Sequence, residues 1–362
     1  MAPLTSAAKR AVVVSPDPTS TVGGAERMCQ QVAGMLARAG FEVALVGPGG
    51  PAPTSVARHG ATLLWQAGAL RRAVGRMAPQ PDLVVTIGPW GWPGLRRPPR
   101  VHVYVSNLVR LARHQPARWH WRVRWALAAG LAEALAARGA TVVAISERTA
   151  EDAVRLYRAD VARVVPPGVD TELFRPRDRG EARRRLGLRL DARYGLFVGR
   201  GEPAKGPAIA LDACGRVGWE LVAVGPGPVP GARALGILSP EELAWAYAAA
   251  DAFVLPSAYE GWAIAVGEAL AAGVPAVTTP VGWAHELGRR VPAYRPFLVP
   301  RQATAVAEAL ERVEAGEAEA AVAEARALVL AEHTAAAFER RWGDLLADMG
   351  LLPKGEGDAG RE

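Results

Sequence analysis

The sequence predicts an α/β protein built from two doubly wound, Rossmann-like domains that face each other across a cleft. Three observations predict this class. The chain has 362 residues, and at about 150 residues per domain this length suggests two domains. Short apolar runs alternate with longer helical patterns in two successive series, as in βαβ units. A proline-bordered, highly charged segment separates the two series. Folds of this class bind ligands at the carboxyl ends of their parallel strands.

The first series begins close to the amino terminus and extends to about residue 157. Its expected strands cover residues 11–14, 42–46, 82–87, 100–105 and 141–145. Its expected helices cover residues 25–39, 69–77, a region rich in Trp and Arg at 108–127, and 148–157. Four of these five strands are followed by a helical pattern, which favours a parallel sheet.

The second series has expected strands at 195–198, 220–224, 252–255, 275–278 and 297–299. The segment 164–176 is rich in proline and is followed by the charge run 177–185, so it reads as a linker. We therefore predict domains at 1–175 and 176–335, a helix at 336–352 that returns to the first domain, and a disordered polar tail at 353–362.

Composition narrows the class of protein further. Half of the residues are apolar, which excludes disordered, collagen-like and coiled-coil proteins. The 43 Lys and Arg residues exceed the 36 Asp and Glu residues, and this basic balance permits an anionic partner without identifying one. Only three of the basic residues are lysines, and Lys205 is the one that lies away from the termini; the others are Lys9 and Lys354.

Targeting and cysteine patterns point to a cytoplasmic protein. The two cysteines, Cys29 and Cys214, are far apart and belong to no metal-binding or disulfide spacing. The amino-terminal apolar run is too short for a signal peptide, and no apolar stretch is long enough to span a membrane.

The most informative stretch is 257–277, where an expected strand ends in a loop that contains Glu260 and Gly261. A helix then runs through Glu268, two turns inside it. Carboxylates accept hydrogen bonds from vicinal hydroxyls, and the free N–H groups at a helix N-terminus suit a phosphate. A nucleotide sugar would satisfy all of these groups. The alternative is that both glutamates lie on solvated surfaces, but the residues around Glu268 are too apolar for that.

These motifs resemble those of the family-4 retaining glycosyltransferases, which have the GT-B architecture. Glu260-x7-Glu268 is followed by Gly273-Val-Pro, and Leu196-Phe-Val-Gly-Arg-Gly-Glu-Pro-Ala-Lys-Gly206 is similar to the family's Gly-Arg-x4-Lys-Gly loop. Further similar motifs are Val165-Pro-Pro-Gly-Val-Asp170, Gly23-Gly-Ala-Glu26 and Val143-Ala-Ile-Ser146. The motifs spread over most of the chain, and their order and spacing make the set specific.

The resemblance implies a function and a set of site residues. Arg200 and Lys205 would hold the diphosphate of the donor, Glu260 the transferred sugar and Glu268 the ribose. Gly199, Gly225, Gly261, Trp262 and Ala263 would complete the donor site. Gly23 and Gly24 would approach phosphate or acceptor in the first domain, with a simple turn as the alternative. The resemblance implies no metal or other cofactor, and the chain has no Asp-x-Asp cation motif near an expected strand end.

The sequence departs from the family in three places. Ala263 stands where many members have Gly. The usual Gly-Gly before Pro-Glu becomes Gly282-Trp283-Ala-His285-Glu286. The histidine that many members have at a strand end of the first domain is replaced by Ser106 or Asn107, and we interpret His102 as structural.

The basic segment 108–127 interleaves arginines with Trp119, Trp121 and Trp125. Such a helix could contact an anionic membrane surface and admit a lipid-linked acceptor. The alternatives are a solvated basic helix with inward tryptophans, or a charged rim for a soluble acceptor. No nucleic-acid partner is expected, since no known nucleic-acid-binding motif accompanies the segment.

The resemblance thus implies a metal-independent enzyme that moves a sugar from a nucleoside-diphosphate donor to an acceptor hydroxyl with retention. The frequency of UDP donors in the family favours UDP over GDP, and the product would belong to glycan, glycolipid or glycosylated natural-product synthesis. The enzyme would be cytoplasmic, or peripheral to the inner face of the membrane. The alternatives are a nucleotide-sugar epimerase of the same fold and a non-enzymatic basic protein that binds membrane or nucleic acid.

Overall fold

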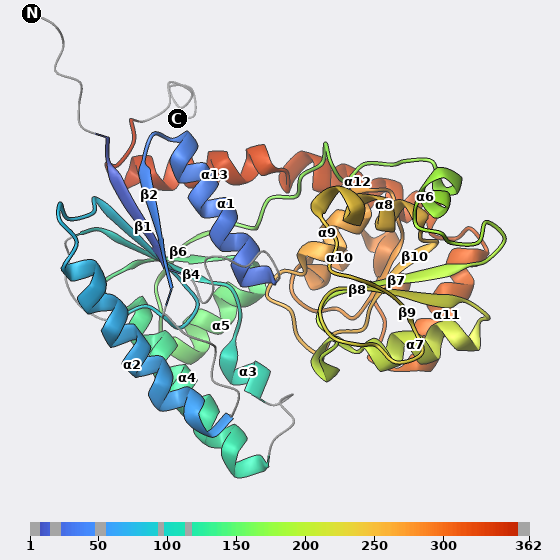
Figure 1. Cartoon of the computed structure of the whole chain (residues 1–362), viewed down its shortest axis with the longest axis horizontal. Helices are drawn as coiled ribbons and strands as arrows, with labels where there is room; N and C mark the ends of the chain where they lie inside the picture. The colour runs from blue at the N-terminus through green and yellow to red at the C-terminus, as the bar shows by residue number, and fades with distance from the viewer. Residues whose placement is uncertain (1–7, 15–22, 48–55, 93–97, 113–117, 354–362) are drawn as a thin grey trace, which may run out of the picture. The chain divides into compact units, whose positions relative to one another are not determined.

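The computed structural model describes residues 8–14, 23–47, 56–92, 98–112 and 118–353 (Figure 1). The chain forms two compact units. The first consists of Met1–Val165 together with Glu339–Glu362, and the second of Pro166–Phe338. The division falls ahead of the charged segment that marks the linker in the sequence. Of the polar tail predicted at 353–362, residues 354–362 lie outside the described residues.

The first unit has a six-stranded parallel sheet in the order β2-β1-β3-β4-β5-β6. Its strands are β1 (Arg10–Val14), β2 (Glu42–Val46), β3 (Leu83–Ile87), β4 (Arg100–Tyr104), β5 (Thr141–Ala144) and β6 (Val161–Val164). Strands β3 and β4 are buried along their whole length. Strand β3 accordingly reads as a continuous apolar or β-branched run. Strand β4 instead alternates, with the buried Arg100 and His102 between its apolar residues.

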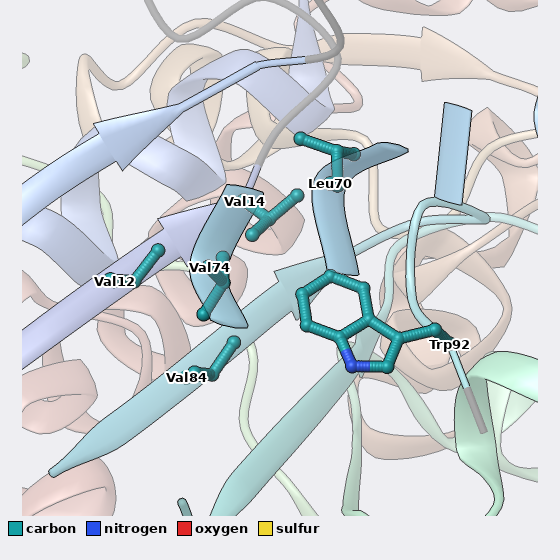
Figure 2. Packing of buried hydrophobic residues seen from close by; sticks show 6 residues of the cluster. All are labelled: Val12, Val14, Leu70, Val74, Val84 and Trp92. Atoms are coloured by element: carbon teal, nitrogen blue, oxygen red, sulfur yellow. The ribbon is translucent and has the colours of Figure 1, made fainter. Parts of the chain in front are cut away.

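The helices of the first unit are α1 (Gly24–Arg38), α2 (Val56–Gly75), α3 (Leu108–Ala112), α4 (Trp119–Ala137) and α5 (Glu147–Tyr157). A core cluster joins β1 and β3 to α2 (Figure 2). In it, valines of the two strands meet Leu70 and Val74 of the helix and the ring of Trp92. Leu70 and Val74 are four residues apart and so lie on one face of α2.

The carboxyl-terminal helix α13 (Ala335–Asp348) begins in the second unit and continues in the first. Its later part is held to the first unit by ion pairs, including Arg38 with Glu339 at 2.6 Å and Arg163 with Asp348. Beyond the helix, Lys9 Nζ donates to the Leu351 carbonyl at 2.6 Å. Trp342 is fully buried, which adds an apolar anchor to these polar contacts.

The second unit has a five-stranded sheet in the order β11-β10-β7-β8-β9, again with all strands parallel. Its strands are β7 (Tyr194–Val198), β8 (Glu220–Val224), β9 (Arg233–Gly236), β10 (Ala252–Leu255) and β11 (Ala276–Thr278). Its α-helices are α6 (Arg179–Arg185), α7 (Pro207–Arg216), α8 (Pro240–Ala249), α9 (Ile264–Ala271), α10 (Trp283–Arg290), α11 (Ala303–Glu314) and α12 (Glu319–Glu332). Two 3-10 helices are η1 (Pro203–Lys205) and η2 (Pro292–Phe297).

Most expected strands are confirmed to within one or two residues, but the sequence interpretation was wrong in three places. The expected strand at 297–299 is the end of η2, where only an isolated bridge joins Leu298 to Thr278. Strands β6 and β9 were missed because they are short edge strands that lack buried side chains. Helix α2 begins at Val56, well before the expected start.

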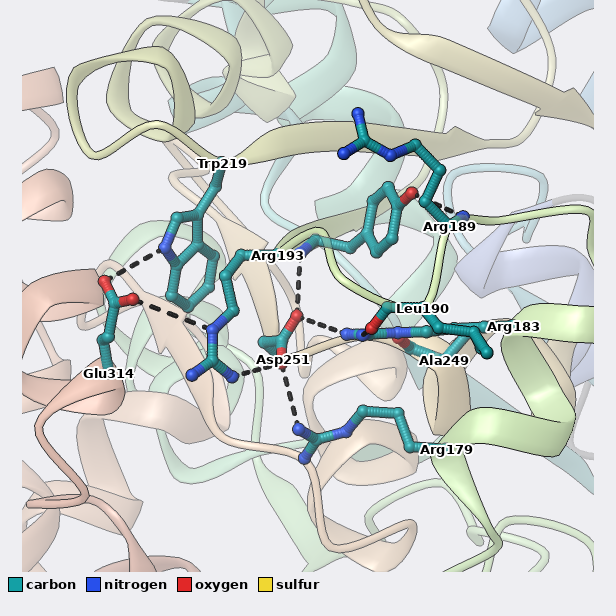
Figure 3. A network of polar contacts seen from close by, with 10 residues as sticks. Arg179, Arg183, Arg189, Leu190, Arg193, Trp219, Ala249, Asp251 and Glu314 are labelled. Carbon is teal, nitrogen blue, oxygen red and sulfur yellow. Dashed lines mark hydrogen bonds and ion pairs between the residues drawn. The ribbon is translucent and has the colours of Figure 1, made fainter.

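A buried carboxylate organises the amino-terminal edge of the second sheet (Figure 3). Asp251 accepts from Arg183 at 2.7 Å, from Arg179 and Arg193 at 3.0 Å each, and from the backbone N–H of Tyr194 at 2.8 Å. Both Asp251 and Arg183 are buried. The network therefore joins α6 to the starts of β7 and β10, at the edge opposite the loops that carry the candidate site.

Candidate active site

The loops that follow β7, β8 and β10 lie at one edge of the second sheet, because these parallel strands are neighbours. The first two loops are in backbone contact, with Gly199 N–H donating to the Val224 carbonyl at 2.9 Å. A Cβ atom at Gly225 would lie 2.3 Å from the Gly199 oxygen. The backbone of Gly225 has φ 131°, a conformation that also favours glycine. Gly199 and Gly225, both predicted from the sequence, are thus brought together.

The loops after β7 and β10 are also joined, through η1. The Ala258 N–H donates to the Ala204 carbonyl at 2.7 Å. A Cβ atom at Gly206 would come within 2.4 Å of the Pro256 oxygen, so that position requires glycine. Arg301 donates from its guanidinium to the carbonyls of both loops, at Pro203 and Pro256. Arg301 was missed in the sequence, where nothing marks it among the many arginines.

Lys205 and Glu260 form an ion pair between these two loops. The Lys205 Nζ atom lies 2.6 Å from Glu260 Oε1 and 2.8 Å from Oε2. Ser257 Oγ donates to Glu260 Oε1 at 2.7 Å. The sequence assigned the lysine to a diphosphate and the glutamate to a sugar, and the structure places the two groups in direct contact. Ser257 was missed, although its position between a buried strand and Glu260 is a usable signal.

Arg200 lies on the same loop as Lys205, immediately after Gly199. Its side chain is exposed, and its guanidinium is 3.7 Å from the carboxylate of Glu202. An exposed pair at this distance contributes little to stability.

Helix α9 begins beside the Glu260 loop, directly after Ala263. Ala263 is left-handed, with φ 70° and ψ 65°, a conformation that costs a non-glycine residue about 1–2 kcal/mol. The alanine thus adopts the backbone geometry that glycine adopts without strain. Gly261 lies in the same loop, so the first turn of the helix and the loop backbone come from one short segment.

Glu268 is about one turn inside α9 and is 3% exposed. Its Oε2 accepts from the hydroxyl of Tyr247 at 2.8 Å, and Tyr247 comes from α8. The tyrosine also donates toward the Ala265 carbonyl at 3.2 Å. The apolar surroundings that the sequence indicated for Glu268 are confirmed. Tyr247, which orients the carboxylate, was missed because helix α8 carries no motif.

Trp262 has a different role from the one that the sequence suggested. Its side chain is 2% exposed and stacks on Trp283, with ring centroids 5.0 Å apart and planes inclined by 18°. His333 contacts both rings edge-on. The Trp262 carbonyl accepts from the Trp283 N–H at 3.2 Å. The indole therefore packs in the core of the unit, and only the backbone of Trp262 could contact a donor.

The glycines predicted in the first unit lie at the start of α1. Gly23 has φ 132° and precedes the first helical residue, and Gly24 is exposed. A methyl group at Gly24 would meet nothing within 4 Å among the residues that the structure describes. Residues 15–22 of the same loop lie outside the described residues.

The structure distinguishes Ser106 from Asn107, the two candidate residues that follow β4. Ser106 is half-buried, whereas Asn107 is almost fully buried and its Oδ1 accepts from Arg110 N–H at 3.0 Å and from Tyr157 OH at 3.2 Å. Asn107 therefore caps α3, and Ser106 is the better placed of the two for a ligand. The structural interpretation of His102 is confirmed. It is fully buried, bonds Thr86 at 2.9 Å, and burial lowers its pKa to about 3.

Glu133, on α4, lies in the same buried network as Asn107. Burial raises the pKa of its carboxyl group to about 8, although hydrogen bonds from Tyr157 and from the Leu108 backbone act in the opposite direction. The nearby carboxylate of Asp152 raises it further, and Asp152 is itself paired with Arg110 at 2.8 Å. Glu133 is therefore protonated in the folded protein at neutral pH.

We expect the Glu133→Gln variant to lose a pH dependence of stability that the wild type has. The folded wild type keeps a proton that the unfolded chain releases near pH 4.5, so its free energy of unfolding should fall as the pH rises from about 4.5 to about 8. The slope for one such group is at most about 1.4 kcal/mol per pH unit. Urea denaturation at several pH values measures it. Equal slopes for the two proteins in this window would contradict the raised pKa.

Metal-binding clusters are absent from the part of the chain that the structure describes: no group of three or more His, Cys, Asp or Glu residues is arranged to hold an ion.

The two parallel α/β units, each with glycine-bearing loops beyond its strands, define a protein of the GT-B fold class. Two family models match in chain order, glycosyltransferase family 4 over residues 22–173 and glycosyl transferases group 1 over residues 192–315. Together they cover about three quarters of the chain. Both halves of the chain therefore match glycosyltransferase family models, which confirms the resemblance seen in the sequence.

Curated relatives and solved structures agree with this assignment. The D-inositol 3-phosphate glycosyltransferase of Acidothermus cellulolyticus is 38% identical over 182 residues, which is 40% of this chain and 40% of that protein. The chain thus matches about two fifths of the length of that relative. Sucrose-phosphate synthase from Thermosynechococcus elongatus has a TM-score of 0.76 at 22% identity, covering 94% of this chain and 99% of that one. Anabaena Alr3699/HepE, solved in complex with UDP-glucose, has a TM-score of 0.69 at 17% identity, with coverages of 94% and 99%.

Proposed function

We propose that this protein transfers a sugar from a nucleoside-diphosphate donor to an acceptor hydroxyl, with retention of configuration. The observation that carries the proposal is the contact between Lys205 and Glu260, beside the start of α9. A cation, a carboxylate and a helix N-terminus are the three kinds of group that a diphosphate joined to a sugar would engage.

The roles follow from the charge that develops during the reaction. The leaving diphosphate gains negative charge as the glycosidic bond breaks, and preorganised cations lower the energy of that state. We assign this task to Lys205, Arg200 and the N-terminus of α9. Donor binding would then exchange the contact of Lys205 with Glu260 for one with phosphate, which leaves the glutamate free to accept from sugar hydroxyls. No step is assigned to a metal ion or a cofactor.

Glu268 is proposed to accept from the ribose hydroxyls, with Tyr247 holding one carboxylate oxygen in place. No enzyme nucleophile is assigned. The acceptor would attack the sugar on the face from which the diphosphate departs, and the diphosphate can itself take the proton of the acceptor hydroxyl. Acceptor recognition is assigned to the first unit, around Gly23, Gly24 and Ser106. UDP is the favoured nucleotide, and the complex of Anabaena HepE with UDP-glucose supports this choice.

A thermal-shift panel of UDP, GDP and ADP tests the donor. We expect UDP to raise the melting temperature most, since a ligand at about 100 times its Kd stabilises the folded state by about 2.7 kcal/mol. This rise in melting temperature should persist at high salt. A protein that responds to none of the three, but binds polyanions in a salt-sensitive way, would be a non-enzymatic basic protein instead.

Product analysis then separates transfer from epimerisation. With the nucleotide sugar alone, a transferase leaves the configuration of the donor sugar unchanged, whereas an epimerase alters it. With acceptor present, the anomeric configuration of the product reports retention or inversion directly.

A further inference from the structure

Helix α4 exposes a row of large apolar side chains. Trp119, Val123, Leu127 and Leu131 recur every four residues and are 71%, 49%, 70% and 52% exposed. Residues at this spacing lie on one face of a helix and extend over about 18 Å. We name these four residues the α4 stripe. Isolated exposed apolar residues are ordinary, but a continuous row on one helix indicates an interaction surface.

The stripe is separate from the face by which α4 packs in the first unit. Trp125, Ala129 and Ala132 are buried in a core cluster with Leu108 of α3. Of the tryptophans that the sequence singled out, Trp125 is thus inward, whereas Trp119 faces solvent. Residues 113–117 of that basic segment lie outside the described residues.

A hollow of about 630 Å³ extends the apolar surface from the stripe toward α5. Leu127 and Leu131 line one side of it, and Leu156 and Tyr157 of α5 line the other. Leu156 is itself 47% exposed. The surface is therefore broader than one helix, and it is hollowed rather than flat.

The stripe is bordered by positive charge. Arg118 and Arg122 precede Trp119 and Val123 by one residue each, which places them along one side, and Arg124 lies on the other side. The acidic residue of α4 is Glu133, which is buried. On α5 the exposed Glu151 is paired with Arg148 at 3.2 Å. The surface thus combines an apolar centre with a basic border.

We infer that the α4 stripe binds the surface of an anionic lipid bilayer. The apolar side chains would enter the boundary between headgroups and acyl chains, and the flanking arginines would remain at the level of the anionic headgroups. A second copy of this chain fits less well, because a two-fold interface along α4 would bring like-charged arginine borders together. Nucleic acid would leave the apolar centre without a partner.

Vesicle co-sedimentation of the full chain tests this inference. We expect at least tenfold stronger binding to phosphatidylcholine–phosphatidylglycerol vesicles than to pure phosphatidylcholine vesicles, and weaker binding as salt is raised. The double variant Trp119→Ser/Leu127→Ser should bind anionic vesicles at least tenfold more weakly than the wild type. The matched control is Leu190→Ser/Ile237→Ser, which removes two apolar residues that are 55% and 63% exposed in the second unit. The control should bind as the wild type does.

Three results would overturn the inference: no wild-type binding to anionic vesicles, equal loss in both double variants, or a stripe-dependent dimer that ignores vesicles. Gel filtration of the same proteins detects the dimer. The thermal response to UDP keeps the inference distinct from the proposed function, because the stripe variant should retain that response. Melting curves without ligand show that both variants are folded.

Discussion

Replacing Lys205 with alanine is expected to lower kcat/KM for sugar transfer by at least about 10²-fold, the usual loss when one preorganised charge-stabilising group is removed. In the structure its ammonium group is 2.6 Å from Glu260 and links the loops after β7 and β10. The variant loses the cation that would meet the departing diphosphate. Lys205→Arg should also be impaired, because a planar guanidinium does not reproduce a compact ammonium group. Steady-state kinetics with the nucleotide sugar and acceptor measures both.

Two controls separate this loss from unfolding. Lys205→Ala leaves the buried Glu260 without its cation, whereas Lys205→Ala/Glu260→Gln removes both charges and should recover melting temperature without recovering turnover. Arg216→Ala, which removes an exposed cation on α7, should be as active as the wild type. Near-normal turnover of a folded Lys205→Ala protein would overturn the diphosphate role.

Replacing Asp251 with alanine is expected to lower the free energy of unfolding by about 3–5 kcal/mol, the loss typical of breaking a buried ion pair from one side. The substitution leaves Arg183 buried without its carboxylate and removes the acceptor for the Tyr194 N–H. It also leaves Arg179 and Arg193 to repel each other and Arg183 (Figure 3). Urea unfolding followed by tryptophan fluorescence measures the effect.

The matched control for Asp251 is Asp212→Ala. Asp212 pairs with Arg216 at 3.1 Å on exposed α7, so its removal should cost less than about 1 kcal/mol. The loss in free energy of unfolding for Asp251→Asn should lie between those for Asp251→Ala and Asp212→Ala, since an amide oxygen can still accept from the Tyr194 N–H. Comparable losses for Asp251→Ala and Asp212→Ala would show that the buried network contributes no more than a surface pair.

Much of the fold was predictable because buried parallel strands have a strong local pattern. The run Val84-Val-Thr-Ile87 and the run Phe253-Val-Leu255 are apolar or β-branched throughout and are bounded by turn residues, and both are central in their sheets. Edge strands β6 and β9 have no such pattern, since each has a neighbour on one side only. The segment at 297–299 has an apolar pattern too, but η2 ends there and the chain continues into α11.

The candidate site was predictable in its members but not in its contacts. Resemblance to the family motifs marks Gly199, Gly225 and Glu260 in the sequence. The partners that hold these groups come from segments without any motif, such as Tyr247 on α8 and Arg301 before α11. Trp262 shows a further limit of the motif, which names the residue but does not indicate that its ring packs in the core.

By itself, the sequence determined the two α/β series, the family motifs and the singular position of Lys205 among the basic residues. These features are local: each depends on the order of residues along one short segment. The tertiary structure alone decided that Lys205 and Glu260 meet, that Asn107 is a buried cap, and that α4 turns Trp119 outward and Trp125 inward. Such contacts join residues far apart in the chain, or depend on which helix face finds a partner, and the packing of neighbouring elements determines both.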